Sequence, residues 1–280
     1  MATGSIYLVP VPIGNLGDIT LRAQETLKRV HVIAAEDTRS TRFLLSQYEI
    51  TPPRLLSLHK YNEKQRIGEI LELLAEGNDL AVVTDAGSPG ISDPAGYLIQ
   101  SAIEHGIVII PLPGATALIP ALTASGLPTQ PFQFLGFLPL KGKDRKAALE
   151  SIRTYLSTSV IYEAPHRLRK TLTDLLAHCG DRNVCICREI TKIYEQFIRG
   201  KLSDILEDYA VTEKGEMVIV IGADDKPLEE ASDSDIQEFI STLLPGKPDT
   251  KSLTNEVCLR FGISRNRAYQ LILSHKNQAK

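Results

Sequence analysis

The sequence is poor in cysteine, lacks tryptophan and has no long apolar run. Its four cysteines, Cys179, Cys185, Cys187 and Cys258, include no C-x-x-C pair, which argues against a disulfide framework or a paired zinc motif. No apolar run reaches the roughly 18 residues needed to cross a bilayer. The first twelve residues lack the basic region and long apolar core of a signal peptide. We therefore expect a cytoplasmic protein with no membrane partner and no bound metal.

Length and composition point to a globular chain of more than one domain. The chain has 280 residues, of which 43% are hydrophobic and 23% charged, and domains usually hold about 100–200 residues. The formal net charge is -3, so the overall field does not favour nucleic acid. Any contact with nucleic acid must come from local basic patches.

Short apolar runs alternate with helical patterns through the first half. This alternation predicts a parallel sheet with helices on its faces. The expected strands are Ile6–Val11, His31–Ala35, Leu55–Leu58, Asp79–Thr84 and Ile107–Pro111. The expected helices are Thr20–Arg29, Arg39–Tyr48, Asn62–Glu76 and Ala95–His105.

The stretch Leu122–Pro139 interrupts this rhythm with glycines and prolines. Adjacent strands beyond it, without an intervening helix, predict a second α/β domain with a mixed sheet. The expected strands are Ser159–Glu163, Val184–Glu189, Glu195–Arg199 and Glu216–Gly222, and the expected helices are Asp144–Leu156, Arg167–His178 and Ser203–Tyr209. We place the domains at 1–122 and 123–225, followed by an acidic linker at 226–235 and a helical module at 236–280. Cys185 and Cys187 should share one face of a buried strand.

Three loops rich in Gly, Pro and small residues each follow a predicted strand. They are Pro10–Gly17, Thr84–Pro94 and Pro111–Ala117. In open α/β sheets, ligands bind beyond the carboxyl ends of strands. None of the loops is G-x-G-x-x-G or a P-loop, which favours a nucleoside without pyrophosphate. The alternative is a tight connection between the strand and the next helix, and under either interpretation we expect Asp93 to cap that helix.

Two charged clusters also follow predicted strands. They are Glu36–Arg39 and Tyr162–Arg167. Asp37 alone is expected to be a helix N-cap, and Arg39 or Arg167 alone is most simply a solvated charge. Taken together at strand ends, the two arginines predict contacts with RNA phosphates.

Seven motifs carry a family resemblance between Ile6 and Gly222. In chain order they are EDTR, TDAGSPGISDP, PLPGATA, GLP…FLGFLP, YEAPHR, REITK-x-YE and KGEMVIVI. The chain thereby resembles the ribosomal RNA small-subunit methyltransferase I family. It departs from the family pattern at Ala95, where Gly is usual, at Ala115–Thr116, which replaces a Pro-Ser pair, and at Tyr61, where a second His is common.

The resemblance implies the tetrapyrrole-methylase (class III methyltransferase) fold, with S-adenosylmethionine in the cleft between two α/β domains. It also implies a homodimer that 2′-O-methylates a cytidine of 16S rRNA in the small ribosomal subunit. The cofactor-binding residues that we expect are Pro12, Asp85, Gly87, Ser88, Ile91, Gly114, Ala115, Thr116, Ala117, Tyr162, Glu163 and Met217.

The sequence leaves the catalytic residue and two rival functions open. The residue that removes the hydroxyl proton is expected among Glu36, Asp37, Glu163, His166, Glu189 and Lys192. One rival is a tetrapyrrole or diphthine methylase on the same fold. The other is a regulatory nucleic-acid-binding protein that only senses S-adenosylmethionine.

The helical module has a helix-turn-helix pattern. Helices are predicted at Ser252–Phe261 and Arg265–Ser274, joined by a turn at Gly262–Ser264. Ser252 should open the first helix and Ser264 the second. The apolar positions Val257, Phe261, Ile263, Ala268, Leu271 and Ile272 should form the seam between the helices. Arg265 and Arg267 would then contact RNA, whereas the simpler alternative is a packing or dimerisation cap.

Overall fold

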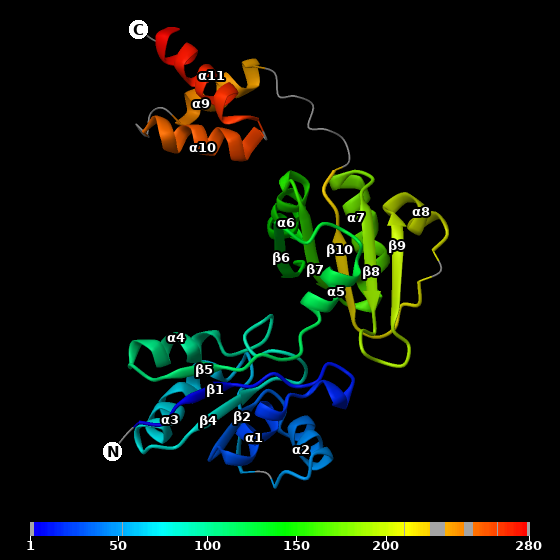
Figure 1. Cartoon of the computed structure of the whole chain (residues 1–280). Helices are drawn as coiled ribbons and strands as arrows, with labels where there is room; N and C mark the ends of the chain where they lie inside the picture. The colour runs from blue at the N-terminus through cyan, green and yellow to red at the C-terminus, as the bar shows by residue number, and fades with distance from the viewer. Residues whose placement is uncertain are drawn as a thin grey trace. The chain divides into compact units, whose positions relative to one another are not determined.

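The computed structural model describes residues 3–51, 53–209, 211–224, 233–243, 249–261 and 263–278. The chain forms two compact units, Met1–Ala223 and Asp224–Lys280, and both predicted sheets belong to the first. Figure 1 shows the elements of each unit. No helix in the described ranges is both long and apolar enough to span a bilayer.

The first sheet is fully parallel, as predicted. Its strands are β1 (Ile6–Leu8), β2 (Val32–Ala35), β3 (Arg54–Ser57), β4 (Leu80–Val83) and β5 (Ile109–Pro111), in the order β3-β2-β4-β1-β5. Its helices are α1 (Leu21–Arg29), α2 (Thr38–Gln47), α3 (Glu63–Ala75) and α4 (Gly96–Glu104), and a short 3-10 turn, η1, covers Leu16–Asp18. Residues of α1 and α2 pack on one face of the sheet, and residues of α3 and α4 pack on the other. Both faces are therefore buried, which explains strands such as Val32–Ala35 that are apolar throughout.

The second sheet is mixed, also as predicted. Its strands are β6 (Phe132–Phe137), β7 (Thr158–Glu163), β8 (Asn183–Arg188), β9 (Gln196–Lys201) and β10 (Met217–Ile221), in the order β6-β7-β10-β8-β9. Only the β6–β7 pair is parallel. The helices α6 (Gly142–Thr154), α7 (Leu168–Cys179) and α8 (Leu202–Glu207) pack on one face. The other face is covered by α5 (Leu118–Ala124).

The predicted irregular stretch and domain boundary need correction. Leu122–Pro139 holds the end of α5 and all of β6, and α5 packs on β10 in the second sheet. The change of sheet therefore precedes Leu118, rather than following residue 122. Glycine and proline concealed β6 because it is an edge strand with a register shift between Phe134 and Phe137, where such residues are tolerated.

The two cysteines of the C-x-C segment lie on β8, as predicted. Cys185 and Cys187 are both fully buried, and their Sγ atoms are 3.6 Å apart. All four cysteines are free thiols. The pair packs with Ala121 and Leu122 of α5, so it acts as part of the core.

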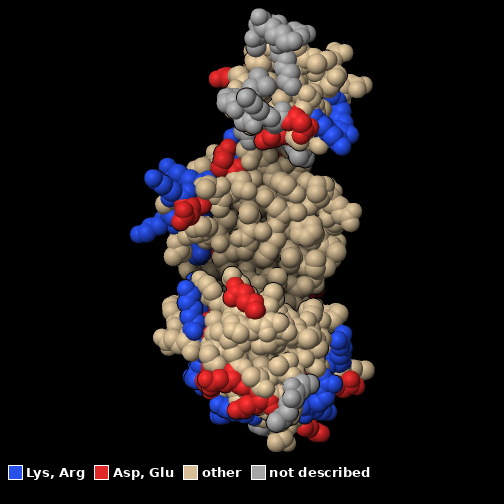
Figure 2. Space-filling view, turned by 90° about the vertical axis from the view of Figure 1, so that its left-hand side faces the viewer, with Lys and Arg blue, Asp and Glu red and all other residues tan. Residues whose placement is uncertain are grey.

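One side of the first unit is unusually apolar. Figure 1 places α4, β5, β6 and α6 on this side, and Figure 2 shows a broad area with few charged side chains over the part that belongs to the second sheet. Outside the residues of the cavities described below, these elements and their flanking loops carry exposed large apolar residues, namely Ile103, Val108, Phe132, Leu140 and Leu156. Exposed apolar patches of this kind mark interaction surfaces.

The described residues of the second unit form three helices, α9 (Asp233–Leu243), α10 (Thr250–Phe261) and α11 (Arg265–Gln278). The predicted seam is confirmed, with Ile236 and Ile240 of α9 added to it. Two details were wrong. Helix α9 begins inside the predicted linker, and α10 is capped by Asp249, whose carboxylate accepts from the Lys251 and Ser252 amides at 2.9 and 3.0 Å.

The cap predicted at Ser264 is confirmed, since its hydroxyl accepts from the Arg267 amide at 3.3 Å. Gly262, predicted to end the preceding helix, lies outside the described residues.

Candidate active site

A cavity of about 440 Å³ lies in the first unit and is lined by residues of both sheets. The first sheet contributes the end of β2 and the loop after β4, and the second contributes the end of β7 and the start of β10. Because β10 runs antiparallel to β7, the start of β10 lies beside the end of β7. The lining residues are Ile13, Glu36, Asp85, Ala86, Gly87, Ser88, Ile91, Ser92, Asp93, Thr116, Ala117, Phe137, Tyr162, Glu163, Ala164, Pro165, Ile190, Gly215, Glu216, Met217 and Val218.

The three predicted loops meet at this cavity. The Val11 and Gly87 backbones exchange two hydrogen bonds, of 2.9 and 3.0 Å. Gly87 has φ +78°, and a Cβ there would lie 3.3 Å from Ile13 Cγ2, so glycine permits both the turn and the close approach. The Ser88 hydroxyl donates to the Ala115 carbonyl at 2.9 Å, which ties in the third loop.

The structure divides the predicted cofactor residues into two groups. Those that line the cavity are Asp85, Gly87, Ser88, Ile91, Thr116, Ala117, Tyr162, Glu163 and Met217. The other three, Pro12, Gly114 and Ala115, do not line it. Gly114 instead lets its loop pass Pro10, whose Cβ would be 2.6 Å from a Cβ on Gly114. Gly114 and Ala115, whose carbonyl accepts from Ser88, therefore shape the loop that borders the cavity.

The cavity wall is acidic. Burial raises the pKa of Glu36, and the charge of Asp85 raises it further. A hydrogen bond from the Asp85 amide opposes this rise. Burial and the charge of Asp37 raise the pKa of Asp85. Burial together with the charges of Glu36 and Asp85 raises the pKa of Asp93 to about 6. None of the described residues in this wall is Lys, Arg or His. The cavity therefore suits a ligand with positive charge and disfavours a phosphate.

The predicted cap at Asp93 is wrong. Helix α4 instead receives a cap from α3, because the buried Glu63 carboxylate accepts from the Leu98 amide at 3.0 Å. Ser92 has φ +68° and Ala95 has φ +139°, so strained backbone lies on both sides of Asp93. Assigning Asp93 to capping concealed a site residue. The available signal was its place in the same strand-following loop as Asp85.

Glu163 and Arg167 stabilise the turn after β7. The Glu163 side chain is fully buried and pairs with Arg167 Nε at 3.1 Å. It also accepts from the Ala164 amide at 2.8 Å and the Thr171 hydroxyl at 2.5 Å. Arg167 donates to the Leu138 carbonyl at 2.6 Å, and its side chain is 17% exposed. This geometry favours a structural role for both residues over proton transfer or phosphate binding.

Asp37 caps α2, as predicted, by accepting from the Arg39 amide at 2.8 Å. Its hydrogen bonds with Arg39 lower the pKa of Asp37 to about 2. Asp37 does not line the cavity. The Arg39 side chain pairs with it at 2.7 Å, yet it remains 88% exposed, so it stays accessible to a large partner.

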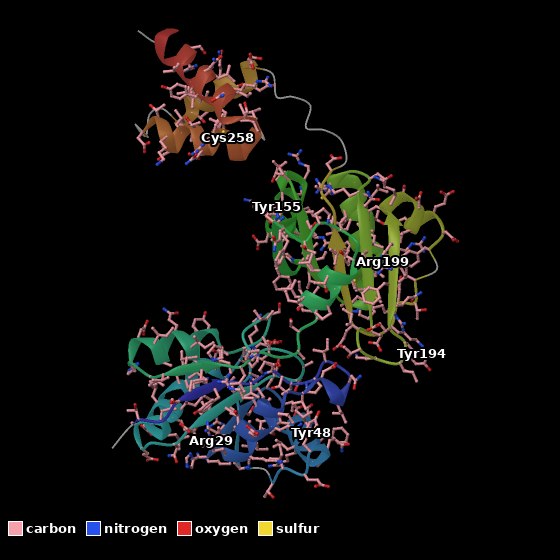
Figure 3. The ribbon with its side chains drawn as sticks, viewed as in Figure 1. Arg29, Tyr48, Tyr155, Tyr194, Arg199 and Cys258 are labelled. Carbon is pink, nitrogen blue, oxygen red and sulfur yellow. The ribbon has the colours of Figure 1, made fainter. Side chains whose placement is uncertain are left out.

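The other three catalytic candidates do not line the cavity. Glu189 and Lys192 lie at the β8–β9 connection, the loop that carries Tyr194 in Figure 3. Lys192 Nζ pairs with Glu189 at 3.0 Å and with Glu216 at 2.8 Å. His166 is exposed on the turn after β7. Of the six candidates, the structure places only Glu36 and Glu163 in the wall.

The two sheets share an acidic cavity beyond the ends of β4 and β7. Known proteins with this fold identify the class of protein to which the chain belongs. The family model for tetrapyrrole (corrin/porphyrin) methylases matches residues 5–206. The solved structure of the methyltransferase CobJ is similar, with a TM-score of 0.60 and 22% identity over 79% of this chain and 95% of that one. Diphthine synthase has a TM-score of 0.62 and 13% identity over 79% of this chain and 90% of that one. These structural similarities show the fold alone.

Several curated proteins are more similar to this chain in sequence than these solved structures are. A protein of Halalkalibacterium halodurans is 47% identical over 81% of this chain and 78% of its own length. One from Synechocystis is 43% identical over 96% and 98%, and one from Streptococcus pyogenes is 42% identical over 96% and 94%. All three are named ribosomal RNA small subunit methyltransferase I. The chain belongs to this family within the tetrapyrrole methylases, which confirms the resemblance carried by the motifs.

Proposed function

We propose that this protein transfers a methyl group from S-adenosylmethionine to the 2′-hydroxyl of a cytidine in 16S rRNA, acting on the small ribosomal subunit in the cytoplasm. The observation that carries the proposal is identity of 42–43% over 96% of the chain to proteins named as small-subunit rRNA methyltransferases. Such identity includes the C-terminal helices, which lie beyond the matched methylase region.

The residues of the first cavity fit S-adenosylmethionine. Its volume of about 440 Å³ lies within the range of about 300–1,000 Å³ typical of small-molecule sites. Glu36, Asp85 and Asp93 supply negative charge for a sulfonium and an ammonium group. A solved uroporphyrin-III C-methyltransferase from Thermus thermophilus, with a TM-score of 0.55 and 18% identity, is described as complexed with S-adenosylhomocysteine. That is a precedent for the ligand on this fold.

Glu36 and Asp93 are the groups we assign to proton acceptance. The cofactor supplies an electrophilic methyl group when bound, so the protein has to align the hydroxyl and accept its proton late in transfer. Both carboxylates line the cavity, and the pKa of Asp93 is about 6, which suits an acceptor near neutral pH. Glu163 lines the same wall, but its contacts with Arg167 and Thr171 commit it to the fold.

We assign RNA contact to Arg39, Arg265 and Arg267. Arg39 is highly exposed beside the cavity-lining Glu36. Arg265 donates to Asn255 at 2.6 Å and Arg267 pairs with Asp233 at 3.1 Å. Surface pairs of this kind contribute only about 0–1 kcal/mol, so a phosphate can compete with them. Arg167 is left out of this surface because it is mostly buried against Glu163.

We also propose that two copies of the chain form a homodimer. The apolar side of the first unit exposes Val108 by 57% and Leu140 by 68%, and its central area carries few charged side chains (Figure 2). A second copy would remove this surface from water. Sedimentation of the wild type should give a dimer, and Leu140→Asp should weaken it. A monomer at micromolar concentration would contradict this assembly.

Transfer of labelled methyl groups to purified 30S subunits tests the proposed function. The modified nucleotide can be identified by mass spectrometry of the digested rRNA. A tetrapyrrole or diphthine methylase would leave the rRNA unlabelled, and a regulatory sensor would bind the cofactor without transferring label. Either of these results would reject the proposal.

Ser88→Trp tests the cofactor placement, because the larger side chain would fill the cavity. Calorimetry should show a loss of S-adenosylhomocysteine affinity of at least tenfold. Unchanged affinity would move the cofactor elsewhere.

Arg39→Ala should weaken RNA binding and reduce its salt dependence, because a lost phosphate contact releases fewer counterions. Cofactor affinity should remain unchanged. If the variant lost cofactor affinity and kept RNA affinity, Arg39 would belong to the cofactor site.

A further inference from the structure

A second cavity, of about 560 Å³, adjoins the first. The two share Glu36, Ser92 and Asp93 in their walls. The residues lining only the second cavity are Lys60, Glu63, Pro94, Gly96, Tyr97 and Gln100. It therefore lies on the α3–α4 side of the first sheet, and Glu36 and Asp93 stand where the two cavities meet. A group bound in the second cavity would present its edge to the first.

The wall of the second cavity combines three kinds of chemistry. Glu36 and Asp93 offer carboxylate oxygens, which accept hydrogen bonds from exocyclic amines such as N4 of cytosine. Tyr97 offers an aromatic ring that is 53% exposed, and unstacked bases bind RNA-modifying proteins by stacking on such rings. Lys60 is exposed at the rim, where a phosphate would lie.

The remaining acidic residue does not add a free charge to the cavity. Glu63 is 4% exposed and its carboxylate holds the first turn of α4 through Leu98. Tyr97 is positioned by the same helix, and Lys64 Nζ lies 4.3 Å from the centre of its ring. The floor is therefore built by α3 and α4, whereas the two carboxylates at the junction remain available to a ligand.

We propose that the second cavity is the pocket for the target nucleoside, which leaves its RNA stack so that the base lies against Tyr97 and its amino group meets Glu36 or Asp93. The amine and the ribose lie at opposite ends of the cytosine ring, so one of the two carboxylates holds the amine, and the ribose reaches the first cavity beside the other carboxylate, which accepts the 2′-hydroxyl proton. Phosphate is excluded from the interior by the two carboxylates and is left at the rim with Lys60. Enzymes that act on a base take it out of the stack and hold it in a pocket, and the same arrangement would fix the attached ribose for methylation. The inference rests on the proposed function, and it assigns the site for the nucleoside.

Gly96→Trp tests the proposal sharply. Gly96 lines only the second cavity, and a Cβ built on it meets no atom within 4 Å, so a large side chain can enter the cavity from α4. Gly68→Trp is the matched control, because a Cβ on Gly68 also meets nothing within 4 Å and Gly68 lines neither cavity. The probes are cytidine and uridine 5′-monophosphate, observed by saturation-transfer NMR with the full chain saturated with S-adenosylhomocysteine.

The wild type and Gly68→Trp should bind cytidine monophosphate more strongly than uridine monophosphate. Gly96→Trp should lose this binding at least tenfold, while its S-adenosylhomocysteine affinity stays within about twofold of the wild type. Tyr97→Ala, which removes an exposed ring, should weaken cytidine monophosphate roughly tenfold, and it provides a second measurement if Gly96→Trp does not fold.

Two results would overturn the pocket assignment. One is undetectable binding of cytidine monophosphate to the wild type. The other is unchanged binding in both Gly96→Trp and Tyr97→Ala while S-adenosylhomocysteine still binds. Failure of the proposed function gives a different result from failure of the pocket assignment. The wild type would then leave 30S subunits unlabelled, whatever the nucleotide probes show.

Discussion

The side chain of Lys192 lies across the backbone of Gly14, so that a Cβ on Gly14 would fall 2.4 Å from Lys192 Cγ. Gly14 follows β1 of the first sheet, and Lys192 belongs to the loop after β8 of the second. Lys192 is held in place by Glu189 and Glu216. The absence of a side chain at Gly14 thus permits a close contact between the two sheets' loops.

Gly14→Ala should therefore destabilise the protein by about 1–3 kcal/mol, because the methyl group overlaps a fixed part of Lys192. The φ of +154° at Gly14 adds strain for any side chain. Urea denaturation followed by circular dichroism measures the effect. Gly68→Ala is the matched control. It lies in α3 with nothing within 4 Å of its Cβ, and it should stabilise the helix by about 0.5–1 kcal/mol. Equal stabilities for the two variants would contradict the contact.

The layers of the fold could be predicted from the sequence because the apolar patterns are local. Strands such as Leu80–Val83 are apolar throughout because helices cover both faces of their sheet. Helix α5 and strand β6 were not predicted, because their structure depends on packing and not on a local apolar pattern. Pro120 lies inside α5 and Gly136 lies in β6 at φ +60°, and local signals assign both residues to loops. Their places are determined by packing on the second sheet and by the tolerance of a sheet edge.

The site could be predicted to the level of its loops, because loops after parallel strands gather at one edge of the sheet. The roles of its charged residues could not, since they depend on contacts between elements. Arg167 reads as a surface charge, but the fold buries the nearby Glu163 with which it pairs and brings Arg167 to the carbonyl of Leu138, 29 residues earlier in the chain. Asp93 reads as a helix cap, but Glu63 occupies that role by accepting from the amide of Leu98, which comes 35 residues later in the chain. Pairings across such separations leave no trace in spacing.

Protonation of Asp93 gives the first cavity a pH-dependent affinity for cations. Its pKa is raised to about 6, so its protonated fraction falls as pH rises through that value. A bound sulfonium favours the ionised carboxylate, so S-adenosylmethionine should bind more tightly at about pH 7 than at about pH 5 and should release protons on binding near pH 6. Calorimetry in buffers of different ionisation enthalpy measures this release.

S-adenosylhomocysteine is the matched ligand for this measurement, because it lacks the sulfonium charge. It should release fewer protons than S-adenosylmethionine, and Asp93→Asn should reduce the difference between the two ligands. The assignment of Asp93 to the cation site fails if both ligands release the same number of protons from the wild type.

Arg182 is predicted to hold the second sheet to its helices. It is 1% exposed and donates to four carbonyls, those of Cys179 at 3.0 Å, Ile152 at 2.9 Å, Arg153 at 2.7 Å and Gly222 at 3.3 Å. Arg182→Met should cost about 3 kcal/mol or more, since it leaves several buried carbonyls unpaired. Arg182→Lys should restore little of this, because an ammonium lacks the planar fork.

Arg153→Ala serves as the control for Arg182, because it removes only the exposed pair with Glu150 and leaves the Arg153 carbonyl in place. It should cost about 0–1 kcal/mol. Thermal denaturation of the three variants separates the two roles. A loss for Arg182→Met no larger than that for Arg153→Ala would show that the carbonyls find other donors.

The C-terminal helices should affect RNA and leave the cofactor site unchanged. They form a compact unit with their own core of Ile236, Ile240, Leu253, Val257, Ala268, Leu271 and Ile272, whereas the residues described as lining the two cavities belong to the first unit. A chain ending at Ala223 should therefore bind S-adenosylhomocysteine with wild-type affinity and methylate 30S subunits at least tenfold more slowly. Equal rates for the two chains would leave these helices with a packing role only.

Charge reversal in the full chain distinguishes RNA contact from folding of this unit. Arg265→Glu combined with Arg267→Glu should reproduce much of the loss, because both positions lie outside the apolar seam and carboxylates repel phosphate. Arg267 also pairs with Asp233 across to α9, so Asp233→Asn is the matched control that breaks this pair without reversing the arginine charge. It should leave the methylation rate near that of the wild type and its salt dependence unchanged. If Asp233→Asn slowed methylation as much as the double reversal, the arginines would act by holding α9 to α11, and the RNA contact would have to be sought elsewhere.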